Sequence, residues 1–362
     1  MPKALQDAII GCILGTAVGD ALGLACEGLS RRRQLKMFPL LDNHKLLPFG
    51  NSGKGMTSDD TEHTCMLAQS LIVTGYSDLA TLEQKFSANF AWRLRFWLLG
   101  LPAGIGFATL RSIIKLWVGF PARYSGVFSA GNGPAMRAAL LGVCFGDEPP
   151  RMQALVRAAT RITHTDPKAE YGAYAVAIAA HMAATQAGDI APDEFIARLS
   201  QHISDMEFMA LMRKVADSVT RGVSAETFAD SIGCSEGVSG YMYHTLPCAL
   251  HVWLAHQDDY RAAVTAMIRL GGDADTTAAI VGAIVGARVG KAGIPAAWLN
   301  NLVEWPRSVT WIEQLGRRLA ASGADHTQRK SLWVNPCKLL FRNAIFMMIV
   351  LLHGFRRLLP PY

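Results

Sequence analysis

The chain of 362 residues is 51% hydrophobic, and its formal net charge at pH 7 is +6. This hydrophobic content excludes an intrinsically disordered chain, and the length suffices to bury a large core in one or two domains. The basic residues form no stripe with interleaved aromatic side chains, which excludes a typical nucleic-acid-binding protein.

The cysteines and the N-terminal segment indicate the cellular compartment. The seven cysteines show no paired spacing and lie mostly in apolar contexts, which predicts reduced thiols and a cytoplasmic protein. The apolar stretch over residues 8–18 is similar to a signal peptide, but Asp7 and Asp20 flank it and no suitable cleavage site follows. We therefore expect a core helix in this segment.

Glycine recurs at every fourth position of the same segment, at Gly11, Gly15, Gly19 and Gly23. On a helix, this spacing leaves one strip without side chains. Because each glycine costs a helix about 1 kcal/mol, the strip indicates close approach of another backbone. The candidate partner is a second strip, formed by Gly282, Gly286 and Gly290. A membrane helix dimer is the alternative, but Asp20 interrupts the run and no second spanning segment accompanies it.

Two acidic clusters, each with a hydroxyl side chain, stand at predicted helix starts. The first lies between a glycine-rich stretch at 50–55 and a helical pattern at 64–75, and reads Ser58-Asp59-Asp60-Thr61. The second precedes a small-residue helix at 278–287, and reads Gly271-Gly272-Asp273-Ala274-Asp275-Thr276. Each cluster alone is typical of an acidic helix start, which the helix dipole favours.

Together, the two clusters favour a metal site. Hard oxygen ligands packed this way suit Mg²⁺, Mn²⁺ or Ca²⁺. Two divalent cations would balance the charges of Asp59, Asp60, Asp273 and Asp275, as in sites where two metals lie about 3.5–4 Å apart. The alternative is two unrelated helix starts on opposite sides of the molecule. Glu27 ends the apolar N-terminal stretch, and we expect it to face a pocket.

The rest of the chain is also predicted to be helical. Helical patterns cover residues 79–99, 107–119, 136–143, 169–184, 193–203, 207–219 and 246–254. A second glycine-rich stretch at 124–134 can present backbone N–H groups to a phosphate, but no βαβ units indicate a Rossmann fold. His251 and His256 are five residues apart, which places them on different helix faces and disfavours a zinc pair. No segment alternates with a period of two, so the sequence predicts an all-α fold.

The C-terminal segment at 332–362 differs in composition from residues 1–331. It is rich in long apolar and basic side chains, and its unbroken apolar run at 344–352 is shorter than the about 20 residues that span a bilayer. Arg342 and Asn343 interrupt the longer run. An interfacial helix, a partner-docking helix and a last helix covering the core all stay open. We expect core covering or partner docking ahead of membrane-surface binding, because the basic residues are few and scattered.

Five motifs follow one another in order along residues 8–310. They are the glycine segment at 15–23 with Glu27, Ser58-Asp59-Asp60-Thr61, Gly131-Asn132-Gly133-Pro134, Ile162-Thr163-His164 and Gly271-Gly272-Asp273-Ala274-Asp275-Thr276. In order and spacing they resemble those of the ADP-ribosylglycohydrolases. The resemblance implies an orthogonal multi-helix bundle with a binuclear metal cleft, carried by a catalytic domain at 1–331 and followed by the tail at 332–362.

The resemblance also implies roles for single residues. The metal ligands would be Ser58, Asp59, Asp60, Asp273, Asp275 and Thr276. The catalytic residues would be Glu27, Asp60 and Asp273, with Glu27 in proton transfer or substrate gating. The ADP-ribose cleft would be lined by Phe128, Ser129, Gly131, Asn132, Gly133 and His164. The cofactors would be two Mg²⁺ or two Mn²⁺ ions.

The implied function is removal of ADP-ribose from modified protein side chains, or from a related conjugate, by a monomeric, cytoplasmic, bacterial hydrolase. A catalytically inactive ADP-ribose binder or an immunity protein that blocks its partner is the alternative. The arginine-specific bacterial relative has an acidic residue two places before the first glycine of the Gly131-Asn132-Gly133 loop, where a carboxylate can hold a guanidinium. This sequence has Ser129 there, so the resemblance does not extend to arginine specificity.

Overall fold

The computed structural model describes residues 3–47, 53–75, 77–324 and 327–361, and it confirms the predicted all-α fold. Within these residues every regular element is a helix, and β pairing is limited to isolated bridges. The elements are α1 (Lys3–Gly23), η1 (Leu24–Cys26), α2 (Arg31–Met37), α3 (Asp59–Thr74), α4 (Leu79–Leu99), α5 (Phe107–Trp117), α6 (Ala122–Ser125), η2 (Ala135–Arg137), α7 (Ala139–Phe145), α8 (Pro149–Arg161), α9 (Pro167–Thr185), α10 (Pro192–Ser200), α11 (Met206–Thr220), α12 (Ala225–Ser231), α13 (Met242–Ala255), α14 (Tyr260–Arg269), α15 (Ala274–Gly293), α16 (Ala296–Asn300), α17 (Val309–Ala324) and α18 (Pro336–Arg356). Residues 50–52 of the first glycine-rich stretch lie outside the described residues.

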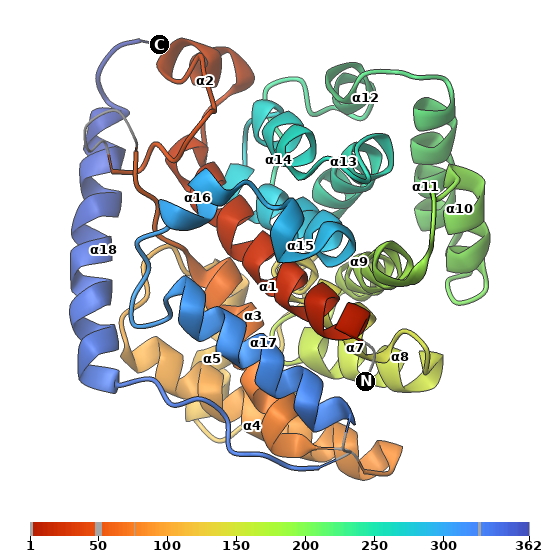
Figure 1. Cartoon of the computed structure of the whole chain (residues 1–362), viewed down its shortest axis with the longest axis vertical. Coiled ribbons are helices and arrows are strands. Elements are labelled where there is room, and N and C mark those ends of the chain that lie inside the picture. The colour runs from red at the N-terminus through yellow and green to blue at the C-terminus, as the bar shows by residue number, and fades with distance from the viewer. Residues whose placement is uncertain (1–2, 48–52, 76, 325–326, 362) are drawn as a thin grey trace.

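The centre of the fold is an antiparallel helix pair formed by α1 and α15 (Figure 1). A Cβ atom added at Gly15 of α1 would stand 2.1 Å from the carbonyl oxygen of Gly282 in α15. The same close approach pairs Gly11 with Gly286, Gly15 with Gly282, Gly19 with Ala278 and Gly23 with Ala274. The predicted contact between the two strips is confirmed, with alanines continuing the second strip toward the start of α15. Because the two helices are antiparallel, the end of α1 meets the start of α15.

In the part of the chain that the structure describes, two helices are long and apolar enough to cross a membrane by length and composition alone. The first candidate segment, Ala4–Cys26, is 94% buried, with α3, α7, α14, α15 and α17 packed against α1, which agrees with the predicted core helix. The second, Pro336–Arg356, is 17% buried and lies along one edge of the molecule (Figure 1). Both segments are therefore apolar, but the first is buried in the protein and the second lies at its surface.

One predicted helix differs in form from the observed one, and the tail adds a helix with two buried polar residues. The helix predicted at 136–143 begins as the 3-10 turn η2 and continues as α7. The tail forms one helix, α18, which includes Arg342 and Asn343, the two residues that interrupt its apolar run. Both residues are buried, and hydrogen bonds to Glu304 and to the Gly100 carbonyl satisfy their polar atoms. Their polar atoms can therefore be buried on the inward face of the helix without loss of hydrogen bonds. The division of the chain at residue 331 remains a prediction.

Candidate active site

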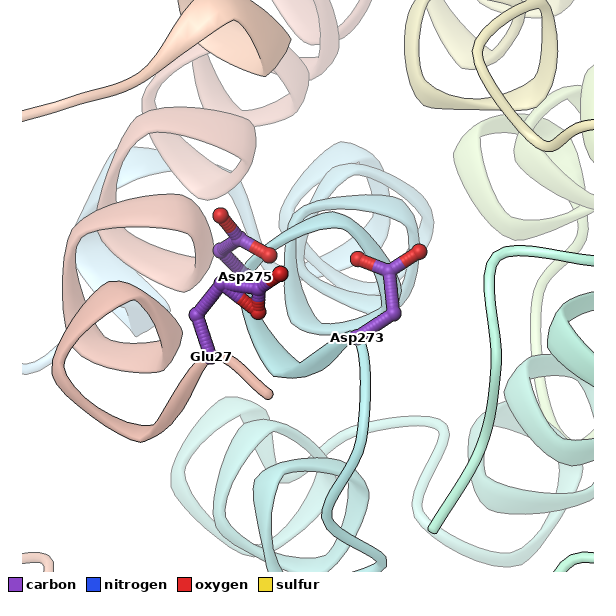
Figure 2. Close-up of side chains that lie close together, drawn as sticks. All are labelled: Glu27, Asp273 and Asp275. Atoms are coloured by element: carbon purple, nitrogen blue, oxygen red, sulfur yellow. The ribbon is translucent and has the colours of Figure 1, made fainter. Parts of the chain in front are cut away.

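The junction of α1 and α15 brings three carboxylates together. Figure 2 shows Glu27 and Asp275 beside each other, with Asp273 to one side. Each offers one oxygen, and these oxygens lie within 4.8 Å of one another. Glu27 follows the 3-10 turn at the end of α1, Asp273 immediately precedes α15, and Asp275 lies in its first turn. Oxygen ligands at this spacing are suited to a shared cation.

A double glycine fixes the position of this junction. Gly271 and Gly272 have φ angles of 70° and 79°, in the left-handed region that glycine adopts readily. The Gly28 amide donates to the Gly272 carbonyl at 2.7 Å, and the Gly272 amide donates to the Leu29 carbonyl at 2.8 Å. A Cβ at Gly271 would stand 2.8 Å from the Leu29 carbonyl oxygen, so a side chain there would break this pairing. The pairing aligns Glu27 with the residues that follow the glycines.

Asp273 is held from its backbone and from its side chain. Its amide donates to the Val238 carbonyl at 2.7 Å. Asn132 Nδ2 donates to Asp273 Oδ2 at 2.7 Å and to Thr245 Oγ1 at 2.9 Å. A Cβ at Gly240 would lie 2.9 Å from the same Asp273 oxygen. The second oxygen, Oδ1, has no contact of this kind within the described residues and is the one available to a ligand.

The start of α3 contributes the second acidic cluster. The Ser58 side chain accepts from the Asp60 amide and caps the helix. The buried carboxylate of Asp20, in α1, accepts from the Ser58 amide at 2.9 Å, from the Thr61 amide at 3.2 Å and from the Thr61 hydroxyl at 2.5 Å. Asp60 Oδ2 accepts from Ser58 Oγ at 3.1 Å and from Thr276 Oγ1, in the first turn of α15, at 3.3 Å. The two clusters that are far apart in sequence therefore meet at one place.

The carboxylates of this site repel one another in a buried setting. Burial, and next the charge of Asp273, raises the pKa of Glu27 to about 7. Burial and neighbouring carboxylates raise the pKa of Asp59 to about 8, and hold the pKa values of Asp60 and Asp275 well above their ordinary range. Glu27 Oε2 and Asp60 Oδ1 are buried without a hydrogen-bond partner among the described residues. Such oxygen donors fit divalent cations, which would offset the repulsion and supply the missing partners.

The acidic cluster lines a cleft of about 760 Å³. The predicted site residues that line it are Glu27, Asp59, Ser129, Gly131, Asn132, Gly133, His164, Asp273, Asp275 and Thr276. Ser58 and Asp60 are buried, with 5% and 0% of their surface exposed, and contact the cluster without lining the cleft. Phe128 is 79% exposed and is not among the lining residues, so its role in binding stays a prediction.

The glycine loop and His164 form another part of the cleft wall. A Cβ at Gly131 would lie 3.0 Å from His164 Nε2, and one at Gly133 would lie 3.1 Å from His164 Cε1, so the ring packs directly on the loop. His164 Nδ1 lies 2.9 Å from Thr163 Oγ1, to which buried Arg137 donates at 2.7 Å. Burial, and next the Arg137 charge, lowers the pKa of His164 to about 3. This histidine is therefore neutral and contributes shape and hydrogen bonding.

The sequence did not indicate which residues support the acidic cluster at the start of α3. Asp20 binds the start of α3, and its signal in the sequence is a carboxylate within an apolar helix. Glu304 accepts from the Thr57 amide at 3.0 Å, directly before Ser58, and Arg342 of α18 donates to the Thr57 carbonyl at 2.5 Å. No pattern in the sequence connects positions 57, 304 and 342, because only the folded chain brings them into contact.

The protein is an all-helical bundle, and its carboxylate-lined cleft fits divalent cations. The model of the ADP-ribosylglycohydrolase family matches residues 1–329, and the chain belongs to this family. The resemblance found in the sequence is thereby confirmed.

Relatives and a solved structure agree with this membership. The chain is 31% identical over 320 residues to an uncharacterized protein of Archaeoglobus fulgidus, covering 87% of this chain and 96% of that protein. It is 27% identical over 327 residues to the ADP-ribosyl-[dinitrogen reductase] glycohydrolase of Rhodospirillum rubrum, covering 89% and 99%. A solved ADP-ribosylglycohydrolase-related protein complex superposes with a TM-score of 0.63 at 28% identity, covering 89% of this chain and 99% of that chain. Family and relatives together support an ADP-ribosyl hydrolase activity.

Proposed function

We propose that the protein is a metal-dependent hydrolase that removes ADP-ribose from modified protein side chains or from a related ADP-ribose conjugate. The observation that carries this proposal is the meeting of the two acidic clusters, through the hydrogen bond from Thr276 to Asp60, at the wall of a cleft of about 760 Å³. The cleft is large enough for a nucleotide-sized ligand. Glycines at 131 and 133 leave the loop backbone accessible from the cleft.

Two Mg²⁺ or Mn²⁺ ions are the cofactors that we propose. Their ligands would be Ser58, Asp59, Asp60, Asp273, Asp275 and Thr276. Buried oxygens without hydrogen-bond partners, such as Asp60 Oδ1, support this assignment. Ions of this kind orient sugar hydroxyls and lower the pKa of bound water when they are present.

The protein side chains have separate tasks in the proposed reaction. Water forms a bond to C1″ of the ribose while the bond from C1″ to the acceptor atom breaks, through an oxocarbenium-like transition state. Glu27, which lines the cleft, takes up the proton of the attacking water, the departing acceptor atom takes a proton from solvent, and Glu27 then releases its proton to solvent. Burial raises the pKa of Glu27 to about 7 in the metal-free protein, which favours proton uptake by this carboxylate. Asn132 keeps Asp273 oriented, and neutral His164 shapes the loop that receives the ADP-ribose.

The test is release of ADP-ribose from peptides modified on arginine or on serine, with Mg²⁺ or Mn²⁺ added. We expect release from at least one peptide and none after Glu27→Gln. Asp193→Asn, which changes an exposed carboxylate on α10 far along the chain from the site, is the matched control and should keep wild-type release. Binding of ADP-ribose by calorimetry without turnover of any conjugate would overturn the proposal in favour of an inactive ADP-ribose binder.

The same two peptides also test which bond to ADP-ribose the protein cleaves, the arginine-linked or the serine-linked one. Ser129 lines the cleft and carries no charge to hold a guanidinium. We therefore expect arginine-linked ADP-ribose not to be preferred over the serine-linked form. We further propose a monomer in the cytoplasm, and the free state of all seven cysteines supports a reducing compartment.

A further inference from the structure

Helix α18 has two chemically different faces. The inward face carries Arg342, Asn343 and Phe346, which are at most 2% exposed. The outward face carries an apolar stripe at helical spacing, and we call it the α18 stripe: Phe341, Ile345, Met348, Leu352 and Phe355. Met348 and Phe355 are 61% and 66% exposed. Figure 1 shows α18 along the edge of the molecule, with no other helix on its outer side.

A second apolar surface lies beside the start of α18. A groove of about 690 Å³ lies between the end of α4 and the segment that leads into α18. Two indole rings line it, Trp92 from α4 and Trp333 from that segment, and they are 54% and 73% exposed. Exposed tryptophans in a groove next to an apolar helix face mark an interaction site. None of these residues lines the acidic cleft.

The sequence alone placed membrane-surface binding last, and the exposed stripe and tryptophans together with the charge of the tail reverse that order. Residues 326–362 contain no aspartate and no glutamate. Lys338 and Arg356 are exposed near the two ends of the α18 stripe. An apolar helix face with basic residues at its ends and neighbouring tryptophans is the pattern of helices that lie in a membrane interface.

We propose that the α18 stripe docks on an anionic lipid surface, with α18 lying in the plane of the interface. The helix does not span the bilayer, because Arg342 is bound on its inward face to Glu304 at 2.6 Å and Asn343 to Gly100 at 2.7 Å. A second copy of this chain fits less well. Antiparallel pairing of two stripes would bring Lys338 of one copy near Arg356 of the other, with no acidic residue in either tail to offset the charge.

The experiment is flotation of the full-length protein with vesicles of phosphatidylcholine, with and without phosphatidylserine. We expect the protein to float with the anionic vesicles and to remain mostly unbound with the zwitterionic ones. Raising the salt concentration should reduce binding, because salt screens the contribution of exposed charges. Flotation needs no hydrolase activity, so this inference and the proposed function fail separately.

Two double variants separate the apolar contribution to vesicle binding from the electrostatic one. Met348→Ser with Phe355→Ser should weaken binding about tenfold or more, because each side chain loses most of the benefit of apolar burial. Lys338→Glu with Arg356→Glu should weaken binding to anionic vesicles by at least about fivefold per position. The matched control is Leu79→Ser with Met206→Ser, which removes two exposed apolar side chains from the starts of α4 and α11 and should float like the wild type.

Three results would overturn the proposal. The first is wild-type protein that stays unbound with anionic vesicles. The second is equal flotation of the Met348/Phe355 variant and the control variant, which would place the contact elsewhere. The third is a dimer in size-exclusion chromatography with light scattering that the Met348/Phe355 substitutions dissociate, which would assign the stripe to a second copy of this chain.

Discussion

Arg342 and Glu304 form a buried ion pair that links α18 to Thr57, directly before the acidic cluster at the start of α3. Arg342 Nε donates to Glu304 Oε1 at 2.8 Å and Nη2 to Oε2 at 2.6 Å, and both side chains are 2% exposed. Both partners also bind Thr57, through its carbonyl and its amide. A residue outside the matched family segment at 1–329 therefore positions the backbone that carries Ser58.

We predict that Arg342→Met destabilises the protein by about 3–5 kcal/mol, because Glu304 is left as a buried carboxylate without its partner. Urea unfolding followed by circular dichroism measures the loss. Lys338→Met removes an exposed cation from the same helix and is the control, with a change expected below about 0.5 kcal/mol. Equal midpoints for the two variants would show that the ion pair does not support the fold.

Truncation after Ser331 removes the whole of α18 and tests the division of the chain at that residue. It also leaves Glu304 unpaired and uncovers Leu24, Leu46 and Met56, which pack with Phe346 in a second apolar cluster. We expect the truncated protein to aggregate or to unfold at lower temperature than the full chain. A soluble, fully stable protein with intact activity would show that the tail is an independent appendage.

The contact between α1 and α15 depends on glycine at positions along its whole length. Gly15→Ala would place a methyl group 2.1 Å from the Gly282 carbonyl oxygen, and backbone atoms cannot move aside as a flexible side chain can. We predict a loss of about 3 kcal/mol or more in unfolding free energy. Gly354→Ala, in α18, meets nothing within 4 Å and should be neutral or slightly stabilising. Thermal unfolding of both variants provides the comparison.

The buried carboxylates predict an unusual dependence of stability on pH in metal-free protein. Folding raises the pKa of Glu27 from 4.5 to about 7 and that of Asp59 from 3.8 to about 8. Between about pH 4 and pH 8 the folded state therefore binds more protons than the unfolded state, and stability falls as pH rises through this window. Thermal unfolding in EDTA should show this fall. Mg²⁺ or Mn²⁺ should raise the midpoint more at pH 8 than at pH 5.5, because cations bind deprotonated carboxylates. A midpoint that rises with pH in EDTA would contradict the prediction.

Asp60→Asn separates the catalytic role of this side chain from its structural role. The amide oxygen can still accept from Ser58 and Thr276, while one of the mutually repelling charges is removed. We predict loss of ADP-ribose release and weaker metal binding by calorimetry, with unchanged or higher thermal stability in EDTA. Asp273→Asn should likewise lose activity. Wild-type turnover of either variant at limiting metal would exclude the proposed site.

Much of the fold followed from the sequence, because helices are encoded locally. Apolar periodicity predicted the all-α class, and the four-residue spacing of Gly11 to Gly23 predicted a backbone contact with the Gly282 strip. The hydroxyl and carboxylate pairs of both acidic clusters predicted two helix starts, since the helix dipole favours acidic residues in a first turn. Ser58 also caps α3 with its side chain, whereas Asp273 makes no such bond at the start of α15. The charge balance of four carboxylates predicted that the two starts meet.

Only the tertiary structure decided which distant residues hold those clusters in place. Asp20 binding at the start of α3, Asn132 binding Asp273, and Arg342 bound to Glu304 all join residues that no local pattern connects. The same holds for α18, because its composition left open a core-covering, a partner-docking or an interfacial helix. Packing fixed Arg342 inward and left Phe355 outward, because a buried charge needs a bonded partner and the core offered one in Glu304.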